Sequence, residues 1–407
     1  MPAAPPHPPP SERAPERVWL LFGIFLRLGL IAFGGPVAHL GYFREEFVHR
    51  RRWLDEASYA DLVALCQFLP GPASSQVGLA LGLLRGGYRG SLAAWAGFTL
   101  PSALAMTLFG LPLGYANNPL HVGVLHGLEL VAVAVVALVV LNMARTLCPD
   151  LPRRVIAGFA AIAALSMPGA WVQLGIIATA AAIGASGLRA SRPTQANTMH
   201  HAGSHRVALS CLLAFFALLL ALPVLASLSG LQGLALIDSF YRTGALVFGG
   251  GHVVLPMLQA EVVPHGWVSE DSFLAGYGAA QAVPGPLFSF AAFLGAAMHD
   301  GVAGLGTAGL CLLTIFLPSF LLVFGVLPFW SRLRAARSAQ AALAGVNAAV
   351  VGLLLAALYD PLWTHSVASA GDVIFILIAL LALHLGRLPP WLVVVLGALA
   401  GSLLEGR

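Results

Sequence analysis

The sequence predicts an all-α, polytopic integral membrane protein with two inverted homologous repeats, broken or re-entrant helices and a central spacer helix. Three observations support this prediction. The composition is very apolar, and the sequence repeats itself after about 215 residues. In addition, loops that are rich in arginine in one copy correspond to loops without arginine in the other.

The composition excludes a soluble globular protein. Hydrophobic residues make up 58% of the chain and charged residues 9%, against about 25% charged in ordinary soluble domains. Apolar stretches recur along nearly the whole length, and about 20 apolar residues suffice for one helical crossing of a bilayer. These stretches lack the alternating pattern of membrane barrel strands, so helices are predicted.

Charge and cysteine content indicate which binding partners are expected. All 21 Lys or Arg residues are arginines, the formal net charge is +4, and no basic stripe points to nucleic acid. The four cysteines are scattered without metal-ligand spacing. We therefore predict no metal and no cofactor, with the lipid bilayer as the surrounding partner. The sequence leaves open whether two copies form a homodimer.

The chain is divided into five parts. We expect a disordered proline-rich tail without a signal peptide (1–17), a first repeat (18–186), a polar cytoplasmic linker (187–206), a spacer transmembrane helix (207–228) and a second repeat (229–407).

The repeat appears when the chain is aligned with itself. Segment 25–35 (FLRLGLIAFGG) then matches 240–250 (FYRTGALVFGG), which places Arg27 on Arg242 and Glu46 on Glu261. The same offset aligns W-x-x-E-x-S, Q-x-x-P-G-P and L-P-S motifs in both halves. Duplicated modules are typical of secondary transporters, whose substrate site lies at the repeat interface.

Arginine counts predict that the repeats are inverted. Segment 36–56 has four arginines and its mate 252–270 has none, whereas 114–120 has none and 331–337 has three. Because cytoplasmic loops collect positive residues, corresponding loops are expected on opposite faces. An unmatched helix, 207–228, is what such an inversion requires.

Glycine and proline mark matching breaks in both repeats. Proline removes a backbone donor and interrupts a helix, so the two P-G-P segments predict hairpins over 57–86 and 271–298. The F-G-G-P segment at 33–36 and the F-G-G-G segment at 248–251 predict second breaks. Irregular backbone inside a membrane is tolerated where it is buried or lines a cavity, which points to the pore.

These motifs resemble those of the long-chain, two-domain members of the chromate ion transporter family. The resemblance covers residues 18–404 and rests on F-G-G-P or F-G-G-G, W-x-x-E-x-S and Q-x-x-P-G-P, each present in both halves. It implies a multi-pass protein of the bacterial inner membrane that exports chromate, a sulfate-like dianion, and confers chromate resistance. The second copy departs from the first where Gly251 replaces Pro36.

Two arginines within apolar stretches are the first binding candidates. A buried arginine matches the geometry of an oxyanion, so Arg27 and Arg242 could neutralise the substrate. Alternatively, Arg27 extends to the membrane surface or Arg242 pairs with Asp238.

The residues at the breaks are the second group. New helix starts expose backbone N–H groups and a partial positive charge, which suits an anion; close helix packing through small residues is the alternative. The predicted binding residues here are Gly34, Gly35, Pro36, Pro70, Gly71, Pro72, Ser74, Ser75, Gly249, Gly250, Gly251, Pro284, Gly285, Pro286 and Ser289, and also Gln67 and Gln281, which could bind the anion or tie each hairpin to a neighbouring helix.

Other polar residues have different expected roles. Asp55 and Ser269 precede helical segments and are predicted to be N-caps. Glu46, Glu261 and His252 are the proton-coupling candidates.

The resemblance implies export of chromate, and a secondary transporter is favoured because no nucleotide-binding motif is present for the use of ATP. A transporter or channel for sulfate or another oxyanion is the alternative. A membrane-embedded enzyme is disfavoured because neither an H-E-x-x-H motif nor a serine–histidine pair appears in an apolar stretch.

Overall fold

The protein was analysed as a computed structural model, in which residues 16–111, 119–167, 170–188, 204–248, 254–299, 301–330, 333, 336–386 and 388–404 are described. All regular structure within these ranges is helical, without a β-strand. Five of the described helices are long and apolar enough to cross a membrane. The predicted all-α fold of a polytopic membrane protein is confirmed.

The first repeat and the spacer supply the first nine elements in chain order. They are α1 (Val18–Ile31), α2 (Gly35–Arg44), the π-helix η2 (Glu45–Arg50), α3 (Glu56–Phe68), α4 (Ala73–Gly110), α5 (Pro119–Leu147), α6 (Leu151–Ser166), α7 (Ala170–Gly187) and the spacer α8 (His205–Ser229).

The second repeat supplies the remaining elements. They are α9 (Gln232–Leu246), α10 (Val254–Val262), α11 (Glu270–Ala280), the 3-10 helix η5 (Leu287–Ser289), α12 (Phe290–Ala297), α13 (Gly301–Val326), η6 (Leu327–Phe329), α15 (Arg337–Ala357), η7 (Leu358–Trp363), α16 (Thr364–Ser366), α17 (Ala370–His384) and α18 (Pro390–Leu404).

The helices end where glycine and proline predicted breaks. α1 stops at Ile31 and α2 begins at Gly35, with Gly34 in the left-handed conformation at φ +96°. The P-G-P segments separate α3 from α4 and α11 from η5. The predicted N-caps are confirmed, because Asp55 accepts the Ser58 N–H and Ser269 accepts the Ser272 N–H.

The element α4 is a helical hairpin, not one straight helix. Gly86 and Gly87 leave the helical conformation, with Gly87 at φ +63°. The two arms then lie side by side, and the Ser91 hydroxyl donates to the Leu79 carbonyl at 2.8 Å.

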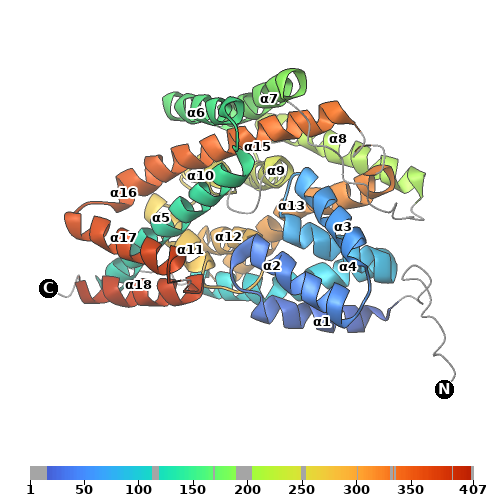
Figure 1. Ribbon diagram of the computed structural model, residues 1–407. Coiled ribbons are helices and arrows are strands. Elements are labelled where there is room, and N and C mark those ends of the chain that lie inside the picture. Colours follow the sequence, from blue (N-terminus) through green and yellow to red (C-terminus); the bar gives the residue numbers. More distant parts are fainter. Residues whose placement is uncertain are drawn as a thin grey trace.

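The two repeats exchange their last two helices. α6 and α7 of the first repeat pack against α15 of the second, and α17 and α18 of the second pack against α5 of the first (Figure 1). Small residues allow this approach, with Gly127 against Gly397 and Gly184 against Gly345. Each repeat therefore packs its last two helices against a helix of the other repeat.

The predicted tail (1–17) and linker (187–206) lie mostly outside the described residues. α7 ends at Gly187 and α8 begins at His205, so these two helices bracket the linker.

We predict that the linker is cytoplasmic and that loops 36–56 and 252–270 lie on opposite faces of the membrane. The reason is the arginine excess in the first loop and its absence from the second. In a variant lacking all four cysteines, Glu45→Cys and a cysteine in the linker should react with an impermeant reagent from the cytoplasmic side, and Pro264→Cys from the other side. Reaction of Glu45→Cys and Pro264→Cys from the same side would contradict the inverted arrangement.

Candidate functional site

The chain breaks of the two repeats contact each other. The backbone N–H of Gly71 donates to the Val247 carbonyl at 2.6 Å, and that of Gly285 donates to the Ala32 carbonyl at 3.0 Å. Ala32 and Val247 are the C-caps of α1 and α9 and occupy the same position in the repeat. The two bonds are therefore the same contact made twice, once in each direction, around a common centre.

Both glycines are required at this centre. Gly71 has φ +118° and Gly285 has φ +107°, backbone conformations that other residues rarely adopt. The space beside each glycine is filled by a serine of the other repeat, Ser319 beside Gly71 and Ser102 beside Gly285. Ser102 and Ser319 come from the aligned L-P-S motifs. The aligned motifs therefore mark both serines in the sequence, although serine in an L-P-S motif does not by itself indicate a contact with the other repeat.

Two helices start at the centre without a side-chain cap. α4 follows Pro72 and η5 follows Pro286, and neither proline has a side-chain acceptor for the first amides of the helix. The Pro72 carbonyl accepts the Gln76 N–H at 2.9 Å, and the Pro286 carbonyl accepts the Ser289 N–H at 3.0 Å. The first amides of a helix have no partner within the helix and carry a partial positive charge. The N–H groups of Gly71 and Gly285 are already bonded to carbonyls, so the donors available to an anion are the amides after Pro72 and Pro286.

Buried hydroxyl groups surround these helix starts. Ser74, Ser75 and Ser289 are each at most 3% exposed. The hydroxyls of Ser75 and Thr99 and the indole N–H of Trp95 have no hydrogen-bond partner among the described residues. Buried donors are nearly always paired, so the hydroxyl of Ser75, which lies in the first turn of α4, is available to water or to a bound ion.

His39 joins the break to the helix start and was missed by the sequence analysis. The ring is 1% exposed. Its Nε2 lies 3.0 Å from the Ala32 carbonyl and its Nδ1 lies 3.3 Å from the Ser74 hydroxyl. The corresponding residue of the second repeat is Val254, so a search guided by the repeat does not select His39.

Other candidates lie nearer the surface or beyond the described residues. Gln67 is exposed on α3. Six further candidates are partly or fully exposed: Gly34, Gly35, Pro36, Pro70, Gln281 and Pro284. Gly249, Gly250, Gly251 and His252 lie outside the described residues.

The two aligned arginines have different surroundings. Arg242 is buried and pairs with Asp238 at 2.6 Å and with Glu261 at 3.1 Å. The alternative in which Arg242 pairs with Asp238 is therefore present in the structure. Arg27 is exposed on α1 and makes no ion pair with any other residue that the structure describes.

The proton-coupling candidates Glu46 and Glu261 are both paired. Glu261 also accepts a bond from the Ser239 hydroxyl at 2.7 Å. Glu46 binds Arg51 at 2.6 Å and Arg50 at 3.1 Å. Burial alone would raise the pKa of the Glu46 carboxyl, but the bonds from the two arginines outweigh it and hold this pKa below its ordinary value. Glu46 is thus held as a carboxylate at neutral pH.

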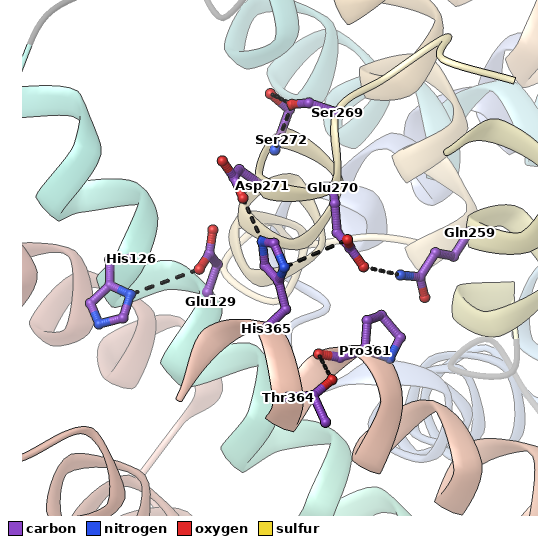
Figure 2. Close-up of polar contacts among 10 residues, drawn as sticks. All are labelled: His126, Glu129, Gln259, Ser269, Glu270, Asp271, Ser272, Pro361, Thr364 and His365. Atoms are coloured by element: carbon purple, nitrogen blue, oxygen red, sulfur yellow. Dashed lines mark hydrogen bonds and ion pairs between the residues drawn. The ribbon is translucent and has the colours of Figure 1, made fainter. Parts of the chain in front are cut away.

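A second polar cluster joins α5 of the first repeat to the second repeat (Figure 2). Figure 2 draws its members His126, Glu129, Gln259, Glu270, Asp271 and His365. Asp372 of α17 also belongs to the cluster through its contact with His126. His126 bridges Glu129 at 3.8 Å and Asp372 at 3.1 Å, and His365 lies 2.6 Å from Asp271. No group of three potential metal ligands was found among the described residues. We interpret these hydrogen bonds and ion pairs as contacts that hold α5 of the first repeat against the second repeat.

Comparisons with known proteins match both repeats of the chain. A family model described as chromate transporter matches residues 19–188 and again residues 234–402. The chromate transport protein of Pseudomonas aeruginosa is 31% identical over 361 residues, which cover 86% of this chain and 82% of that protein. The probable chromate transport protein of Synechococcus elongatus is 28% identical over 94% of both chains. No solved structure gives a significant match.

Proposed function

Because this chain belongs to the chromate transporter family, we propose that it is a secondary transporter that exports chromate across the bacterial inner membrane and so confers chromate resistance. The observation that carries the proposal is the reciprocal contact of Gly71 with Val247 and of Gly285 with Ala32. It brings the broken helices of both repeats to one centre, which is the usual position of a substrate site in transporters built from repeats.

The centre has the chemistry that a dianion requires. An oxyanion inside a membrane needs positive potential, and uncapped helix starts provide it without a further buried full charge. The amides after Pro72 and Pro286 and the buried hydroxyls of Ser74, Ser75 and Ser289 are the donors that we assign to the ion. We add Arg27 as the positive side chain, since the charge of Arg242 is already balanced by two carboxylates.

The membrane potential is a sufficient driving force for export. A potential that is negative inside expels anions, and a dianion gains about 4.6 kcal/mol per 100 mV because each elementary charge contributes about 2.3 kcal/mol. No nucleotide would be consumed. Sulfate has the same charge and a similar shape, so it is the ion against which selectivity must be measured.

Flux into and out of proteoliposomes tests this function. We expect saturable chromate flux that follows an imposed voltage and that is stimulated by chromate on the opposite side, as a carrier requires. Sulfate flux should be measured in parallel, and imposed pH gradients should be added in separate experiments. Flux without stimulation from the opposite side would indicate a channel. Folded protein that transports neither ion above the level of empty liposomes would contradict the proposal.

A further inference from the structure

We propose that His39 is the proton-binding residue of the oxyanion site and that its protonation turns the Ser74 hydroxyl toward the ion. The inference rests on the proposed function and deepens it, because it identifies the group through which a proton and an oxyanion affect each other's binding. His39 acts through Ser74 and is therefore a positioning residue.

The partners of the ring fix where its hydrogens lie. A carbonyl oxygen can only accept, so the contact of 3.0 Å to the Ala32 carbonyl requires that Nε2 carries a hydrogen. The second partner is the Ser74 hydroxyl, 3.3 Å from Nδ1, which can either donate or accept. The direction of this second bond is consequently set by the protonation state of Nδ1.

The two states differ in the direction of one hydroxyl hydrogen. In the neutral ring, Nδ1 has a lone pair, and the Ser74 hydroxyl donates to it. When one proton from water binds to Nδ1, Nδ1–H donates to the Ser74 oxygen instead. The hydroxyl hydrogen then rotates and can donate to an oxyanion, and the imidazolium adds one positive charge nearby. Loss of that proton reverses both changes, so no other reactant is needed.

The place of Ser74 makes this rotation relevant to the ion. Ser74 lies in the first turn of α4, where the uncapped amides begin. The Ala32 carbonyl that holds Nε2 also accepts the Gly285 N–H at 3.0 Å. His39 therefore connects the helix start of the first repeat to the break of the second, directly at the centre.

The charged side chains on the elements around the ring are mostly paired or exposed. The contacts of the ring include the Ser74 hydroxyl and the Phe98 ring of α4 and the Ala32 carbonyl at the end of α1. The ion pairs nearby join Arg44 and His49 to Glu56, Glu46 to Arg50 and Arg51, and Arg85 to Glu16. Glu45, Arg89 and Arg27 are exposed.

The second repeat cannot make the same change, because Val254 occupies the position of His39. The site thus takes up one proton per ion. By reciprocity, the proton strengthens oxyanion binding as much as the oxyanion strengthens proton binding. A dianion leaving with one proton still carries one net negative charge, so a membrane potential that is negative inside continues to favour export.

Calorimetry of the purified full-length protein with chromate provides the test. Titrations in buffers of different ionisation enthalpy give the protons taken up per bound ion, after correction for the protonation of free chromate. At a pH where the ring is neutral in the free protein and protonated in the chromate complex, we expect uptake of about one proton by the wild type. We expect none by His39→Gln, whose amide can still donate to the Ala32 carbonyl. The affinity of His39→Gln should no longer rise as the pH falls.

Two serine variants separate this role from a merely structural one. Ser74→Ala should weaken chromate binding roughly tenfold at low pH, where the hydroxyl is expected to donate to the ion, and flatten the pH profile. Ser75→Ala removes a hydroxyl that we assign to the same ion but that does not bond to His39. It should weaken chromate binding at every pH and still take up about one proton per bound ion. Wild-type protein that binds chromate without proton uptake would overturn the inference even if His39→Gln failed to fold. An absence of chromate binding at every pH would instead count against the proposed function.

Discussion

Gly71→Leu and Gly285→Leu are each expected to abolish chromate transport and to weaken chromate binding by about a hundredfold or more, because each leucine strains the backbone and overpacks the centre. Both glycines have a positive φ, which an L side chain adopts only with strain. A Cβ on Gly71 would lie 2.7 Å from the Ser319 hydroxyl, and one on Gly285 would lie 2.8 Å from the Ser102 hydroxyl. The leucine side chain would separate the two repeats at their common centre.

The two substitutions should be equally severe. Each glycine belongs to a different repeat, but each donates to a carbonyl of the other repeat through the same type of bond. Damage in either half therefore displaces both helix starts. A site confined to one repeat would instead tolerate one of the two substitutions.

Matched controls must separate backbone strain from damage to the site. Gly230 has φ +64° with no atom within 4 Å of an added Cβ, so Gly230→Leu introduces strain at the end of α8 alone. Gly306 in α13 also has free space around it and has no unusual φ. Gly397 is unsuitable, because a Cβ there would contact Val131 at the crossing of α18 and α5.

Chromate affinity by calorimetry and thermal unfolding in detergent should be measured on all four variants. We expect the Gly71 and Gly285 variants to lose affinity, and the two controls to retain it. Normal affinity combined with lowered stability would show that these glycines serve helix packing. The assignment of the pore to this centre would then lose its main support.

The positions of the breaks could be predicted from sequence because they depend on local chemistry. Proline and glycine interrupt a helix wherever it lies, and an N-cap such as Asp55 or Ser269 needs only its own first turn. The exchange of helices between repeats could not be predicted in this way. Apolar membrane helices carry similar apolar side chains on all sides. The sequences of α6 and α17 therefore do not indicate which helix each of them contacts.

Side-chain environments within the site were predicted less well. The alignment makes Arg27 and Arg242 equivalent, but Asp238 beside Arg242 corresponds to Gly23, a difference already visible in the sequence. His39 was overlooked for a related reason, since its mate is Val254. Aligning the repeats identifies the residues that the two halves share. Charged residues present in only one half are found by examining the aligned positions that differ.

The second substitution with a large expected effect on transport is Arg27→Ala. We expect Arg27→Ala to reduce chromate transport about tenfold to a hundredfold, because a hydrogen bond from a charged group contributes about 1.5 to 3 kcal/mol. Stability should be nearly unchanged, since Arg27 is exposed and pairs with no other described residue. Arg27→Lys should restore part of the activity, because an ammonium keeps the charge but lacks the planar pair of donors.

Arg242→Ala should also lose transport, but because the protein is destabilised. Removing this side chain leaves Asp238 and Glu261 buried without their shared guanidinium, and breaking a buried ion pair from one side is destabilising by about 3 to 5 kcal/mol. We therefore expect a lower unfolding temperature and little folded protein. In contrast, the Arg27→Ala protein should be obtained in normal amounts and should lose transport alone.

Transport in proteoliposomes and thermal unfolding, measured on the same preparations, separate the two arginines. Loss of flux with an unchanged unfolding temperature is the result expected for Arg27→Ala, and the loss should appear as weaker chromate binding in calorimetry. Because a guanidinium that binds the ion acts by charge, the difference between wild type and Arg27→Ala should shrink as salt is added. Full flux by a stably folded Arg27→Ala protein would remove Arg27 from the site, and the helix starts and hydroxyls of the centre would then have to supply all of the positive potential.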